Sequence, residues 1–315
     1  TAQYDAAAAM IGMKDWDGAT RTLEDFRQRF PKHPLQADVG SKLALAYLEK
    51  QQWSQAAGEF ERVAATQKDP QLAREALWQS AELHEKAADA KSGSRVTAAK
   101  AYERYLEQYP LPLERGLEAR YRMARMAKAD GDVKREAVLM KEIYQGDLAG
   151  GGARTDRTRY LGATAALTMA EPVVAEYRKV SLVEPLARNL KLKKAKMEDA
   201  LKAYAVAANY GVADVTTAAT FQIASLYQDF GQSMIKSERP KKLSKAEREQ
   251  YDVLLEEQAF PFEEKAIELH ETNVKRAADG IYDQWVRNSF TALGKLRPAR
   301  YGKTERAEGV VDAIR

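Results

Sequence analysis

The hydrophobic pattern of the chain repeats a trio of positions: a small residue, a large apolar or aromatic residue four later, and a proline twelve later. Two copies are complete and a third lacks the proline: Ala19 with Leu23 and Pro31, Ala98 with Tyr102 and Pro110, and Ala56 with Phe60. Another large side chain stands seven positions after each alanine, at Phe26, Tyr105 and Val63. Because residues four and seven apart share one helix face, the pattern predicts helices that each bury one side.

The distance between copies predicts a repeat architecture. The spacings are 37, 42, 39, 63 and 66 residues, measured between Ala19, Ala56, Ala98, Ala137, Ala200 and Ala266. The first three spacings suit a two-helix hairpin with short inserts, and the last two indicate repeats with extra elements. A single hairpin cannot bury its apolar face alone, so neighbours stack into a superhelix. We therefore predict an all-α, superhelical solenoid of helical hairpins.

Local signals place several helix ends in the first part of the chain. Asp17 is positioned to cap the second helix, since its carboxylate accepts from the free amides of the first turn, and Ser54 has the same role in a later helix. Asp69 and Pro70 open the third repeat, because proline fits the first turn of a helix. We expect regular repeats over residues 1–145.

Residues 146–315 continue the same array with irregular repeats. A helix is predicted over 156–170, followed by an insertion at about 171–196. The insertion contains Pro172 and Pro185. Its short apolar runs fit either a broken helix or an extended segment.

A second insertion is predicted at about 238–257. Ser244 with Glu247 three residues later forms a capping box, which predicts the start of an extra helix. A separate partner helix is then expected over 261–278. A further helix is expected to start within 305–315, so we expect the natural protein to be longer than this chain.

Composition narrows the class of protein. Helix-forming residues prevail, and 50 Lys and Arg against 46 Asp and Glu give a net charge of only +4, which does not by itself argue for nucleic acid or membrane. The absence of cysteine excludes disulfides, cysteine-bound zinc and thiol catalysis. No apolar run approaches the roughly 18 residues that a membrane helix needs.

No local arrangement of side chains indicates catalysis. His270 lies near several glutamates, which fits a metal or acid–base site, or a solvated helix face paired with Lys265 and Lys275. Three glycines at 150–152 precede Arg154 and a helix, which fits a phosphate site or a flexible loop. We favour the second interpretation in both cases, and expect no catalytic residue, cofactor or metal.

Two clusters of basic residues do not suggest a catalytic or metal site, but they could bind an acidic partner. They are Arg188, Lys191, Lys193, Lys194 and Lys196, and then Arg239, Lys241, Lys242 and Lys245. Acidic lipid head groups and acidic protein partners both fit them, as does the simpler interpretation of solvated loops and helix ends, which we favour. Nucleic acid is disfavoured, because neither cluster interleaves aromatic residues for base stacking.

The repeat positions resemble those of the tetratricopeptide repeat family. The residues that carry the resemblance are Leu43, Ala44, Tyr47, Ala56 and Phe60, then Ala98, Tyr102 and Pro110, with looser copies at Ala7, Met10, Ala19, Leu23 and Pro31 and at Ile223, Ala224 and Tyr227. The consensus tryptophan and glycine are mostly missing, so the resemblance rests on the small and aromatic positions. It implies a right-handed array that binds peptides or proteins and has no chemistry of its own.

Residues from Lys196 to Thr304 also resemble large repeat proteins of Gram-negative envelopes, which are often associated with TonB-, Tol- or gliding-type systems. This resemblance implies a periplasmic or outer-membrane-associated location, with a cytoplasmic one as the alternative. It also implies protein partners within a multiprotein envelope complex.

We therefore expect a non-catalytic scaffold for protein partners. Two alternatives stay open: a regulatory or substrate-docking arm of a larger enzyme, and a solenoid that associates with peptidoglycan or carbohydrate. The residues expected to contact a partner are Lys42, Tyr47, Arg74, Arg120, Tyr282, Trp285 and Arg287.

Overall fold

A computed structural model describes residues 1–303, and its regular structure over that range is helical, with no strand. The prediction of an all-α chain of packed helical hairpins is confirmed. The chain forms two compact units, which we call unit 1 (Thr1–Thr158) and unit 2, which begins at Arg159. The helix expected within 305–315 lies outside the described residues.

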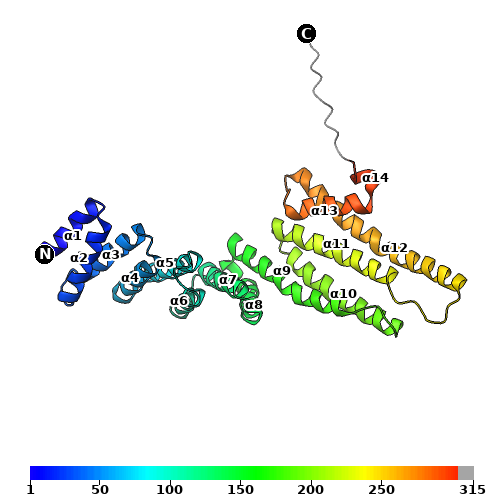
Figure 1. Cartoon of the computed structure of the whole chain (residues 1–315), viewed down its shortest axis with the longest axis horizontal. Coiled ribbons are helices and arrows are strands. Elements are labelled where there is room, and N and C mark those ends of the chain that lie inside the picture. The colour runs from blue at the N-terminus through cyan, green and yellow to red at the C-terminus, as the bar shows by residue number, and fades with distance from the viewer. Residues whose placement is uncertain (304–315) are drawn as a thin grey trace, which may run out of the picture. The chain divides into compact units, whose positions relative to one another are not determined.

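Unit 1 is a solenoid of four helical hairpins, in which each helix packs on the next along the chain (Figure 1). Its helices are α1 (Ala2–Gly12), α2 (Trp16–Arg29), α3 (Gln36–Glu49), α4 (Trp53–Thr66), α5 (Pro70–Asp89), α6 (Arg95–Gln108), α7 (Leu113–Ala129) and α8 (Val133–Ala149). We call α1, α3, α5 and α7 first helices, and α2, α4, α6 and α8 second helices. A short 3₁₀ turn, η1 (Gly151–Ala153), follows α8.

The small residue of the trio is the fourth residue of a second helix. Ala19, Ala56 and Ala98 occupy this position in α2, α4 and α6, and each is fully buried. A methyl group there allows the neighbouring helix to come close, and the larger residues that follow on the same face fill the space beside it. Tyr102 and Tyr105 do so in α6, where both are fully buried.

The fourth hairpin departs from the predicted register by one residue. Ala137 is exposed, and the fourth residue of α8 is Glu136. Met140 and Ile143, four and seven residues after Glu136, are buried as the pattern requires. The Glu136 carboxylate lies 3.6 Å from the Lys128 ammonium, so a charged side chain takes the place of the small one.

Two of the predicted caps are corrected by the structure, and the predicted helix start at Asp69 and Pro70 is confirmed. Asp69 caps α5 by accepting from the amides of its first turn. In α2 the cap is Asp15, while Asp17 lies inside the helix and pairs with Lys50 at 2.6 Å. Ser54 also lies within its helix, because α4 already begins at Trp53.

Unit 2 is built from longer helices. After α9 (Asp156–Lys179), which begins in unit 1, come α10 (Leu186–Ala208), α11 (Ala213–Ile235), α12 (Lys245–Lys275), the 3₁₀ turn η2 (Arg276–Asp279), α13 (Gln284–Leu296) and α14 (Pro298–Tyr301). From α10 to α14 consecutive α-helices pack on one another, and α11 also contacts α13 (Figure 1). Gly211 ends the turn after α10 with a φ of 69°, a left-handed conformation that favours glycine.

The segment 171–196 is helical on both sides of a short loop, which agrees with the broken-helix alternative and not with an extended segment. α9 continues through Pro172 to Lys179, and α10 starts at Leu186, so only 180–185 form a loop. Pro172 is exposed, so its ring faces solvent and the helix continues on its buried side.

The segment 238–257 likewise adds length to a helix. Ser244 and Glu247 form the predicted capping box. The helix that they start continues through the exposed Pro261 to Lys275, so the expected extra helix and its partner are one 31-residue helix. The wider repeat spacing in this part of the chain therefore reflects longer helices.

Candidate partner-binding surfaces

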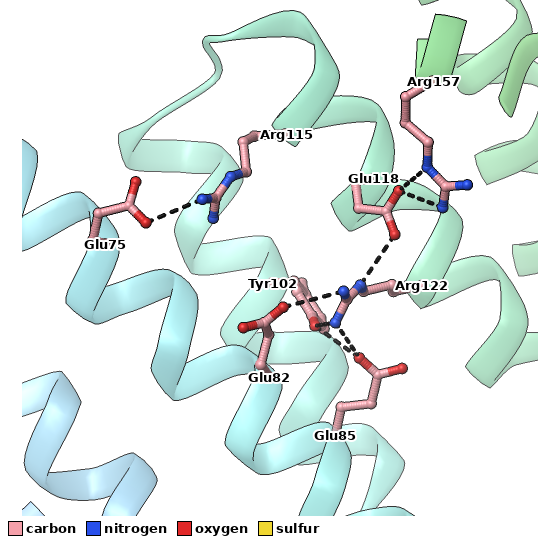
Figure 2. Close-up of polar contacts among 8 residues, drawn as sticks. All are labelled: Glu75, Glu82, Glu85, Tyr102, Arg115, Glu118, Arg122 and Arg157. Carbon is pink, nitrogen blue, oxygen red and sulfur yellow. Dashed lines mark hydrogen bonds and ion pairs between the residues drawn. The ribbon is translucent and has the colours of Figure 1, made fainter. Parts of the chain in front are cut away.

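An arginine in α7 ties the third hairpin of unit 1 to the fourth (Figure 2). The Arg122 guanidinium lies 3.1 Å from Glu82 and 3.1 Å from Glu85, both on α5. It also pairs with Glu118, one turn earlier on α7, at 3.3 Å. The Arg122 side chain is only 26% exposed, so these ion pairs are partly shielded from water.

Two aromatic residues, Tyr102 and Trp78, contact the Arg122 guanidinium. Arg122 donates to the Tyr102 hydroxyl at 2.9 Å, and that hydroxyl lies 2.8 Å from the Glu85 carboxylate. Burial, together with Glu85, raises the pKa of Tyr102, so the phenol keeps its proton. The buried Trp78 ring lies 5.5 Å from the Arg122 guanidinium carbon and 4.5 Å from that of Arg115. The two arginines thus flank one indole ring.

The outer pairs extend the same network. Arg115 pairs with Glu75 at 3.0 Å, and Arg157 at the start of α9 pairs with Glu118 at 2.7 Å (Figure 2). The eight residues drawn in Figure 2 include four carboxylates and three guanidiniums, which leaves one excess negative charge. The charges therefore mainly satisfy one another, and their main effect is to hold the hairpins together.

The network lies along two first helices, on a side that we call the α5–α7 face. Side chains three and four residues apart share a helix side. Figure 2 draws four members of this face, Glu75 and Glu82 on α5 and Glu118 and Arg122 on α7. Their helical spacing adds Gln79 on α5 and Arg125 on α7. Gln79 and Arg125 are exposed, so the face is open to solvent within the described structure.

The partner residues predicted in unit 1 do not converge on this face. The Lys42 ammonium lies 5.5 Å from the Tyr4 ring, and Tyr47 is buried with its hydroxyl donating to Glu24. Arg74 is half-buried, 4.0 Å from the Glu75 carboxylate. Arg120 binds Glu142 of α8 at 3.0 Å, within its own hairpin. Their roles in binding stay predictions.

The partner residues predicted in unit 2 lie around the start of α13. Trp285 is half-buried, and its ring centre lies 5.5 Å from that of Phe221 on α11. Tyr282 and Arg287 are exposed, with the guanidinium carbon 5.9 Å from the ring centre of Tyr282. Trp285 thus has a packing role, while Tyr282 and Arg287 remain open to a partner.

His270 is a core residue of unit 2. It is fully buried, with Nδ1 3.3 Å from the Ser289 hydroxyl and its ring 5.3 Å from Phe221. Burial lowers the pKa of His270 from 6.5 to about 4, so the ring is neutral at pH 7. The glutamates are directed elsewhere: Glu264 and Glu271 bind Arg297 at 3.0 and 3.5 Å.

Two other candidate sites are occupied by internal contacts or lack the required donors. After the three glycines, Arg154 binds the buried Asp147 at 2.7 Å, which directs this guanidinium to α8. In residues 1–303 no group of three or more His, Cys, Asp or Glu side chains is placed to hold a metal ion. None of the helices described is both long enough and apolar enough to cross a membrane.

The two basic clusters are less uniform than their sequences suggest. In the first, Lys193 is buried while Arg188, Lys191 and Lys194 are exposed. In the second, Arg239 binds Asp252 at 2.5 Å and donates to the carbonyl of Ile235 at 2.7 Å. Lys193 and Arg239 are thus parts of the fold of unit 2.

Comparison with known proteins agrees with the repeat pattern. The tetratricopeptide repeat family model matches residues 1–33 and 75–111. A solved tetratricopeptide repeat protein from Parabacteroides merdae is similar at 14% identity and a TM-score of 0.33, covering 93% of this chain and 96% of that one.

A second solved structure comes from work on the computational design of self-assembling cyclic protein homooligomers. It is similar at 15% identity and a TM-score of 0.26, covering 93% of this chain and 94% of that one. No curated protein matches the chain.

Replacement of Arg122 tests whether the network stabilises unit 1. Arg122→Gln removes the cation that Glu82 and Glu85 share and leaves Glu118 with Arg157 alone, and we expect it to lower the free energy of unfolding by about 2 kcal/mol. In the control, Arg135→Gln, the lost pair with Glu103 is 43% exposed on each side, and the expected loss is below about 1 kcal/mol. Urea unfolding followed by circular dichroism measures both, and equal losses would contradict the account.

Acidification tests the burial of His270. The unfolded chain binds the proton near pH 6.5 and the folded chain only near pH 4, so the neutral ring stabilises the fold fully above pH 6.5. This contribution declines as the pH falls from 6.5 to 4, by about 3 kcal/mol in all. His270→Gln cannot titrate, so the stability difference between wild type and variant should shrink over this range. If the free energies of urea unfolding of wild type and variant change equally from pH 6.5 to pH 4, the ring is not buried as described.

Proposed function

We propose that this chain is a non-catalytic scaffold that holds a partner protein on the α5–α7 face of unit 1. Two facts support a scaffold in general: the family match over residues 1–33 and 75–111, and the consecutive packing of hairpins. Repeat arrays of this kind use extended surfaces of successive repeats to bind other molecules.

The fixed network on α5 and α7 is the observation that carries the choice of face. Arg122 and Arg115 are held by ion pairs and by the Trp78 ring before any partner arrives. A surface whose side chains are already ordered loses less conformational entropy on binding. Its exposed members, such as Gln79 and Arg125, are then free to contact the partner.

Site-specific photocrosslinking tests this face. A photoreactive amino acid at Gln79 or at Arg125 should give the same partner adduct in the cells that make the protein, since both positions lie on one face. The matched control is Val138, an exposed residue of the second helix α8, where we expect no such adduct. An adduct at 138 but none at 79 and 125 would contradict the choice of face.

We also propose that this scaffold belongs to a bacterial envelope assembly, in the periplasm or at the outer membrane. The support is the resemblance of residues from Lys196 to Thr304 to envelope repeat proteins. Cell fractionation with an antibody against the chain is the test. Recovery in the envelope fractions is expected, and recovery only with cytoplasmic markers would contradict the proposal.

A further inference from the structure

Unit 2 has a cavity of about 740 Å³ where α9 ends and α11 ends. Its walls come from the end of α9, the loop after it, one residue of α10 and the last turns of α11: Arg178, Val180, Ser181, Leu182, Val183, Lys193, Asp229, Gln232, Ser233, Lys236, Ser237 and Glu238. The cavity and the α5–α7 face have no residue in common, so an inference about the cavity goes beyond the function proposed for unit 1.

A buried lysine forms one wall of the cavity. Lys193 is 4% exposed, and its ammonium donates to the carbonyl of Val180 at 3.0 Å and lies 4.2 Å from the Tyr177 ring centre. Its nearest carboxylate, Asp229, is 4.0 Å away and accepts the Tyr177 hydroxyl at 2.7 Å. Burial lowers the pKa of Lys193, and the charge of Asp229 acts in the opposite direction.

Two more cations border the same space. Arg178 and Lys236 are exposed, and neither forms an ion pair with any residue in the part of the chain that the structure describes. The carboxylate of Glu238 is already engaged, since it accepts from the amide of Glu184 at 2.9 Å. Three cations against two carboxylates leave an excess of one positive charge around the cavity, which favours an anionic ligand.

The loop along the cavity alternates between exposed and buried residues, as an extended segment does. Leu182 is buried, and its carbonyl accepts from the amide of Glu238 at 2.9 Å. Its neighbours Ser181 and Val183 are exposed, and their amides donate to no backbone carbonyl among residues 1–303. Alternate residues of an extended segment face opposite ways, so these two amides are placed for an added strand.

We propose that this cavity binds an extended, acidic peptide segment of a partner protein. The peptide backbone pairs with the amides of Ser181 and Val183. One peptide carboxylate lies among Arg178, Lys193 and Lys236, and aliphatic side chains beside it contact the apolar part of the wall. The backbone pairing provides affinity for extended peptides in general, and the carboxylate selects acidic ones.

A matched pair of peptides tests the charge requirement. The probes are fluorescein-labelled heptapeptides of alternating valine and serine with aspartate or asparagine at the centre, measured by fluorescence anisotropy with the full chain. The aspartate peptide should bind about tenfold more tightly, because it makes charge-assisted hydrogen bonds. Equal binding of the two peptides, or binding of neither, would overturn the proposal.

Charge variants locate the peptide on the chain. The double variant Arg178→Gln with Lys236→Gln removes two exposed cations, so the fold is retained while affinity for the aspartate peptide falls about tenfold. The control, Arg188→Gln with Lys191→Gln, removes two exposed cations that do not line the cavity and should leave the affinity unchanged. An equal loss in both double variants would refute the assigned position.

Backbone methylation tests the strand pairing without altering the protein. Two aspartate peptides are N-methylated at alternate positions, one at odd and the other at even residues. Only one set of peptide amides faces the loop, so only one methylated peptide should lose affinity. Equal affinities for the two would refute strand addition. None of these outcomes changes the crosslinks expected at Gln79 and Arg125, so this proposal and that for unit 1 fail separately.

Discussion

Close approach of two helices at one small residue is the constraint on which unit 1 depends. At the fourth position of α2, α4 and α6 the side chain is a methyl group, and it is fully buried in all three helices. Packing at this density leaves room for large residues one and two turns later, such as Tyr102 and Tyr105. It also fixes where the next hairpin sits, and thereby brings Arg122 of α7 against Glu82 and Glu85 of α5.

The hydrophobic pattern was sufficient to predict the fold class, because the trio lies on one helix face. The pattern gave a wrong register or a wrong helix boundary where a single residue departed from the repeat or from its usual place in a helix. In α8 the alanine that fits the pattern, Ala137, is exposed, and Glu136 takes the repeat position. Pro172 and Pro261 suggested helix ends, yet both lie on exposed helix surfaces where packing of the opposite side maintains the helix.

The candidate sites depend on contacts that no local pattern reveals. Arg122 meets carboxylates about forty residues earlier in the chain, and only the stacking of hairpins brings them together. Lys193 was predicted to be solvated, as one member of a basic cluster. Its spacing is a signal that could have corrected this, because it stands four residues before Met197 and seven before Ala200, both buried. Its partners, the carbonyl of Val180 and the Tyr177 ring, come from the preceding helix and loop and were not predictable.

The most direct measurement compares two alanine-to-leucine substitutions in second helices of unit 1. Ala98→Leu inserts a larger side chain at the fully buried fourth position of α6, and we expect a loss of about 1–3 kcal/mol in the free energy of urea unfolding. Ala137→Leu makes the same change at the exposed fifth position of α8, where the expected change is within about 0.5 kcal/mol. Equal effects of the two substitutions would contradict the central role of the small residue.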